Sequence, residues 1–185
     1  MKWIVGAVVL VVIIVIAWFA GWLGTSTSQS PSGSAAVSNG VSLASDTAIA
    51  NLLTAIDTQV LTLANSITSL SSGTGPTTTG IATSAAQEQT VITLLNQLDM
   101  QLRGRVAQAN MNATQGIMST LEQNLGTANS QVQTVLSALG TTKKLDPLAL
   151  RLTSSQLQAG LTALKSADAS AKAVARMIAT STTTH

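Results

Sequence analysis

The ionisable side chains of this chain are few and widely spaced. Its seven acidic residues are Asp46, Asp57, Glu88, Asp99, Glu122, Asp146 and Asp168. No two of them lie within four positions of each other, so a carboxylate pair for acid–base catalysis or a carboxylate metal site would have to be assembled from different helices. The single histidine, His185, is the last residue of the sequence, and we assign it no catalytic role. The sequence therefore predicts neither catalytic residues nor a metal site.

Other residue types that commonly hold cofactors or substrates are also missing. The sequence has no cysteine, which excludes disulfides, thiolate metal sites and cysteine nucleophiles. The stretch 71–80, SSGTGPTTTG, lacks the lysine and the strand–turn–helix setting of a phosphate-binding loop. Beyond position 22 there is no aromatic residue on which bases, sugars or flavins could stack. We expect a protein that is not an enzyme, takes no cofactor or small-molecule substrate, and does not bind nucleic acid.

Two charged residues fall on apolar faces of predicted helices. Asp168 occupies a d-like position of the last helix, and Arg105 occupies the corresponding position of the helix before it. We predict that Arg105 and Asp168 approach each other or share a polar break in the core. The alternative is that Asp168 turns outward to Lys165 and Lys172 on its own helix. Because ionisable groups are so sparse, folding is expected to depend weakly on pH.

Apolar residues that alternate in steps of three and four indicate packed helices. They predict an all-α fold with helices at about 43–71, 82–139 and 147–179, forming a three-segment helical hairpin or coiled-coil bundle over 43–180. The stretch 71–80 ends the first helix, Gly140 closes the second, and Asp146-Pro147 opens the last as its N-cap and first residue. The middle segment contains no proline, so we expect it to be continuous or bent near Gly104.

An uninterrupted apolar run, Trp3–Leu23, precedes this domain and predicts a transmembrane anchor at residues 1–23. About 20 apolar residues at ~1.5 Å rise each cover the ~30 Å core of a bilayer. Trp3 stands at one end of the run and Trp18 and Trp22 at the other, where indole rings favour the headgroup level. With Lys2, these residues are the predicted membrane interface. The positive-inside rule then leaves the N-terminus cytoplasmic and the C-terminal domain outside.

Shorter signals complete the predicted organisation. Ala17 and Gly21 form a small-xxx-small pair that would let two spans pack closely. Residues 24–42 are rich in Ser, Thr and Gly and predict a flexible linker, and residues 181–185 a tail. Two alternatives to the anchor stay open, namely a cleaved signal peptide and a pilin-type leader.

The predicted helix lengths suggest a function. If the middle helix is continuous, the outer two helices lie along different halves of it, giving a rod only two helices thick whose apolar surface would need partner chains. This predicts a single-pass membrane protein of the cell envelope or a virion membrane, whose self-associating rod is a structural or assembly element. Its partners would be the lipid bilayer and further copies of itself or other structural proteins. The alternatives are a membrane-tethered binding or sensing module and a pilin-like filament subunit.

Overall fold

The computed structural model describes residues 37–72, 75–108, 111–141 and 145–182, with side chains between residues 46 and 181 of these ranges. The described chain is all-helical, as predicted. Its elements are α2 (Val37–Ser71), α3 (Thr78–Gln108), the short 3-10 helix η1 (Asn112–Thr114), α4 (Gln115–Thr141) and α5 (Pro147–Thr182).

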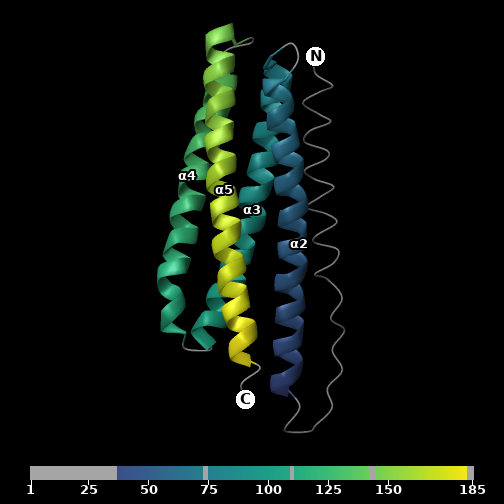
Figure 1. Ribbon diagram of the computed structural model, residues 1–185, viewed down its shortest axis with the longest axis vertical. Coiled ribbons are helices and arrows are strands. Elements are labelled where there is room, and N and C mark those ends of the chain that lie inside the picture. Colours follow the sequence, from purple (N-terminus) through teal and green to yellow (C-terminus); the bar gives the residue numbers. More distant parts are fainter. Residues whose placement is uncertain (1–36, 73–74, 109–110, 142–144, 183–185) are drawn as a thin grey trace. The chain divides into compact units, whose positions relative to one another are not determined.

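The four long helices pack as a bundle in which each runs antiparallel to the next (Figure 1). Arg105, near the end of α3, forms an ion pair with Asp46 in the first turns of α2. Ser181, near the end of α5, donates a hydrogen bond to the sulfur of Met111, which lies between α3 and α4. The connections are short, which is the usual arrangement of an up-down-up-down bundle.

Aliphatic and alanine side chains from all four helices fill the core. Most of the apolar positions that predicted the helices are buried, although Leu53, Ile117, Leu139, Leu150 and Ala175 stay partly exposed. The fully buried large side chains are Ile56, Leu63, Ile67, Ile81, Val91, Leu95, Leu98, Leu102, Leu121, Leu157 and Leu164. The periodicity therefore identified the inward face of every helix.

Side-chain capping fixes where two of the helices begin. The Asp146 carboxylate accepts a hydrogen bond from the Ala149 amide at 2.7 Å, which confirms the predicted N-cap ahead of Pro147. Thr77 does the same for α3, because its hydroxyl accepts from the Gly80 amide at 3.0 Å. Gly75 precedes it with φ of 86°, a backbone conformation that side chains disfavour.

The middle of the chain departs from the prediction. Residues 82–139 are not one continuous helix, and Gly104, the predicted bend, lies inside α3. The chain instead reverses after Gln108, and the hydroxyl of Thr114 donates to the Met111 carbonyl at 2.8 Å in the turn that starts α4. Because of this reversal, the two halves of the predicted long helix, α3 and α4, pack against each other and against α5. The two-helix rod is therefore corrected to a four-helix bundle that covers its own core.

The start of the domain also differs from the prediction. Helix α2 begins at Val37, within the predicted linker 24–42, because no proline lies between Pro31 and Ser71 and a single Gly40 costs a helix only about 1 kcal/mol. The predicted anchor at 1–23 lies outside the described residues. Within them, one segment, Asp46–Ser71 of α2, is long and apolar enough to cross a membrane. Its Ile56, Leu63 and Ile67 are buried, so its apolar character also serves the bundle core.

Candidate functional site

The most unusual side chain in the described bundle is Glu88, on the inner face of α3. It is fully buried, and neither carboxylate oxygen has a hydrogen-bond partner. The carboxyl group lies against Gly160 of α5, where an added Cβ would overlap Oε1 and stand 2.7 Å from Cδ. Ser84, one turn earlier on α3, is also buried with an unpartnered hydroxyl. Gly160 thus provides the space that admits the Glu88 carboxyl into the core.

Burial changes the acidity of this group. Desolvation raises the pKa of Glu88 from 4.5 to about 8, because the charged carboxylate loses its hydration inside the bundle. No charged side chain offsets that loss. At neutral pH the group is therefore mainly the uncharged acid, and a buried neutral carboxyl can be a proton donor.

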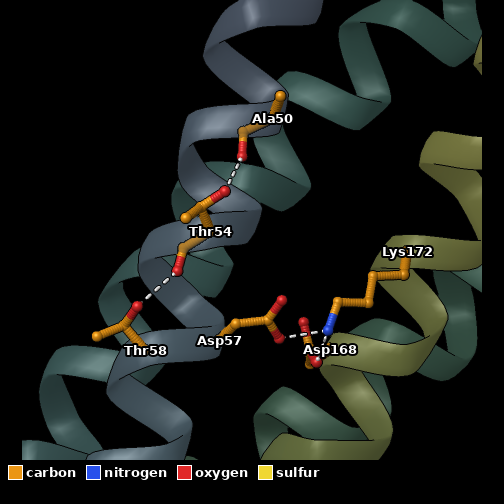
Figure 2. Close-up of polar contacts among 6 residues, drawn as sticks. All are labelled: Ala50, Thr54, Asp57, Thr58, Asp168 and Lys172. Carbon is orange, nitrogen blue, oxygen red and sulfur yellow. Dashed lines mark hydrogen bonds and ion pairs between the residues drawn. The ribbon is translucent and has the colours of Figure 1, made fainter.

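A second polar cluster joins α5 to α2. Lys172 contacts both Asp57 on α2 and Asp168 on its own helix, the latter at 2.7 Å (Figure 2). Asp168 is buried and one of its oxygens has no partner. Burial raises the pKa of Asp168, while its bond to Lys172 acts in the opposite direction. The pKa of Lys172 is raised, because its hydrogen bonds to the two carboxylates outweigh its desolvation.

The predicted pair of Arg105 and Asp168 is not formed. Arg105 binds Asp46 at 2.8 Å, whereas Asp168 binds Lys172. The prediction placed both residues correctly on inward faces, but it rested on a continuous middle helix. Once α3 turns back after Gln108, the end of α3 meets the start of α2. The alternative that Asp168 points to Lys172 is correct for the partner, although the side chain is buried.

The outward faces of the helices are lined by hydroxyl side chains bonded to their own backbone. On α2, the Thr54 and Thr58 hydroxyls donate to the carbonyls of Ala50 and Thr54, each at 3.0 Å (Figure 2). Similar bonds recur on α4 at the heptad-spaced positions Thr120, Thr127 and Thr134. We call these rows the hydroxyl ladders. Their donors are already satisfied, so a neighbouring surface could cover them without stranding polar groups.

An open groove follows the outer side of α3 and α4. It consists of two adjoining depressions with cavity volumes of about 560 and 340 Å³, both bordered by Glu122. Met111 and Met118 line the larger depression, and amide side chains line much of the rest. Arg103 crosses the groove by pairing with Asp99 at 2.8 Å and with Glu122.

Nothing in the described part of the chain gathers three or more metal-binding side chains into one group. No protein-family model matches the sequence, and comparisons with curated proteins and with solved structures find no significant match. Function must therefore be argued from this chain alone.

The other predicted site residues, Lys2, Trp3, Trp18, Trp22, Ala17 and Gly21, lie outside the described residues. The prediction missed Glu88, although the sequence contained a signal for it. The apolar row of α3, which we call its seam, consists of Val91, Leu95, Leu98 and Leu102 at steps of four and three. One further step of three toward the N-terminus from Val91 reaches Glu88.

Proposed function

We propose that this protein is a membrane-anchored structural or assembly subunit that displays a self-contained four-helix bundle on the extracytoplasmic side. The anchor is the apolar run Trp3–Leu23, and the linker that follows it gives the bundle freedom from the membrane surface. Lys2 supplies the orientation through the positive-inside rule. The bilayer and neighbouring copies of the chain are the proposed partners.

The surface of the bundle carries this proposal. Only 9% of residues are charged, well below the ~25% of typical domains. Many of these charges pair within the bundle, in the clusters around Arg103, Arg105 and Lys172. The hydroxyl ladders leave the outer faces weakly polar with their donors satisfied. Such faces can pack against neighbours without desolvating ions.

The four-helix bundle gives self-association a different physical basis from the two-helix rod that the sequence predicted. A two-helix rod would need partner chains to complete its core, whereas the four-helix bundle does not. Assembly would therefore occur between folded bundles through their outer faces.

A second candidate, a membrane-tethered binding module, is favoured by the groove between α3 and α4, whose cavities are of a size that small ligands or peptide segments occupy.

Cross-linking in native membranes separates the two candidates. The full chain is treated with a short amine-reactive cross-linker at several expression levels and analysed by mass after denaturation. A structural subunit gives a defined oligomer whose fraction does not depend on expression level. A monomer at all levels would overturn the assembly proposal and leave the binding module. The uncleaved mass of the same sample tests the anchor against a cleaved signal peptide.

A further inference from the structure

The core contains an acid that has no structural partner, at a point where two helices meet closely. Glu88 comes from α3, and the surface it touches on α5 is the backbone of Gly160. A leucine or methionine at position 88 would fill a similar volume at no desolvation cost. An unpartnered buried carboxyl is costly in a bundle and calls for an explanation beyond packing.

We propose that Glu88 and Gly160 form a proton-controlled latch between α3 and α5, closed while the carboxyl is neutral and released when it ionises. In the neutral state the carboxyl packs against Gly160 as a small polar group. Loss of the proton places a full charge in the core with no counter-ion, and the lost hydration of that charge opposes ionisation. Water can relieve that cost only where α3 and α5 separate. Because Gly160 has no side chain, a small displacement there suffices to hydrate the carboxylate.

The charged groups around the latch do not neutralise it. On α5 the charged residues nearest in sequence to Gly160 are Lys165, Asp168 and Arg151, about 7.5, 12 and 13.5 Å away along the helix axis at ~1.5 Å per residue. Lys165 and Arg151 are exposed, and Asp168 is paired with Lys172. Charged residues on the other described helices, together with those further along α5, pair elsewhere or lie toward the opposite end: Asp46, Asp57, Asp99, Arg103, Arg105, Glu122, Asp168, Lys172 and Arg176. Desolvation alone accordingly governs the pKa of Glu88.

The opening is confined to one part of the bundle. Glu88 lies in the first third of α3, near the connections that precede α3 and α5. Toward the other end, Lys172 ties α5 to α2, and Arg105 ties α3 to α2. We expect the helices to separate around Glu88 and to stay packed beyond Leu98.

The proton itself can be followed directly. The chain contains only two glutamates, Glu88 and Glu122, so selective ¹³C labelling of the glutamate carboxyl carbon gives two signals. In the full chain in mild detergent, the exposed Glu122 provides the internal reference. The latch requires the Glu88 signal to titrate with a midpoint near pH 8. A Glu88 signal that titrates in the ordinary acid range would overturn the proposal.

The movement is measured by paired spin labels, for which the absence of native cysteine leaves the background clean. Exposed positions Thr83 and Ser155 report on the latch end, and exposed positions Gln101 and Ala169 on the opposite end. Each pair is changed to cysteine, labelled, and diluted with unlabelled chain to suppress signals between copies. Between pH 6 and pH 9.5 the first pair should lengthen and broaden while the second stays constant.

The matched variant is Glu88→Gln, which keeps the side-chain shape but cannot ionise. In that background the first pair should give the same distances at both pH values. An unchanged first pair in the wild type, or an equal change in Glu88→Gln, would overturn the latch. If Glu88→Gln fails to fold, Glu88→Met serves the same purpose, and the carboxyl titration of the wild type stands independently. Neither measurement depends on membrane location or on assembly, so failure here is distinct from failure of the proposed function.

Discussion

We expect the free energy of unfolding to depend on pH through Glu88, because the folded and unfolded chains should bind its proton with different affinity. The pKa of this group is 4.5 when hydrated and about 8 in the bundle. Between these values the folded state holds the proton more tightly, so stability is full below pH 4.5 and falls as pH rises through 8. At 1.36 kcal/mol per pKa unit, the loss approaches roughly 5 kcal/mol. The raised pKa of Asp168 adds a contribution of the same sign.

We therefore expect the urea midpoint of the wild type to fall steadily from pH 5 to pH 9, and that of Glu88→Gln to change much less. Circular dichroism at 222 nm provides the measurement. The sparseness of acids in the sequence predicted a weak pH dependence, whereas the burial of Glu88 predicts a clear one, and this measurement decides between them. Equal slopes for the two proteins would show that Glu88 is hydrated in the native state.

The Lys172 cluster has one exposed and one buried carboxylate, and this difference gives a second prediction. Lys172→Met leaves Asp168 in the core without its cation, and we expect a loss of about 1–2 kcal/mol, reduced from the value for fully buried pairs because Lys172 is partly exposed. Asp57→Asn removes only the exposed partner and should cost less than about 0.5 kcal/mol. Urea unfolding at pH 7 measures both. A larger loss in Asp57→Asn would mean that the link to α2, not the burial of Asp168, governs the cluster.

At the scale of helices, periodicity and capping residues were sufficient to predict most of the fold. The seams predicted the buried faces, and Asp146-Pro147 predicted the start of α5. The reversal after Gln108 was missed because residues 109–113 contain neither glycine nor proline, the usual markers of a turn. The seam is interrupted in this region by polar and small residues. That interruption marked a reversal of the chain and not a bend in one helix.

The candidate sites were harder to predict because they depend on which helices meet. Asp168 was correctly placed on an inward face, but its neighbours follow from the topology, and one wrong connection changed the partner of Arg105. Gly160 gave no sign in the sequence of receiving a carboxyl from another helix. Contacts of this kind are set by three-dimensional packing, which a one-dimensional pattern does not encode.

The effect on stability of replacing a helical glycine by alanine depends on the atoms that face the glycine. At Gly160 a Cβ would overlap Glu88, so Gly160→Ala should destabilise the bundle by about 1–3 kcal/mol through overpacking. At Gly104 the same Cβ would meet no atom within 4 Å, so Gly104→Ala should stabilise by about 0.5–1 kcal/mol through helix propensity. Thermal unfolding at pH 6 compares them.

A double substitution tests whether the overlap is the cause. In a Glu88→Ala background the obstructing carboxyl is gone, so adding Gly160→Ala should be neutral or stabilising. The two changes are thus expected to be strongly non-additive. If Gly160→Ala costs the same with and without Glu88, the glycine is required for another contact of α5.

At the scale of the whole molecule, the bundle holds its core within its own helices, and the proposed anchor precedes it in the sequence. We expect a chain that begins at Val37 to fold to the same helical content as the full protein, with a melting temperature within a few degrees of that of the full protein.

The shortened chain should also leave the membrane fraction, because the apolar run Trp3–Leu23 is removed. Sedimentation of lysates after sonication, with the full chain as control, measures the second effect. Full-length chain in the pellet and shortened chain in the supernatant is the expected result. If the folded, shortened chain still sediments with membranes and resists carbonate extraction, the apolar segment Asp46–Ser71 holds it there, and α2 would have to leave the bundle to do so.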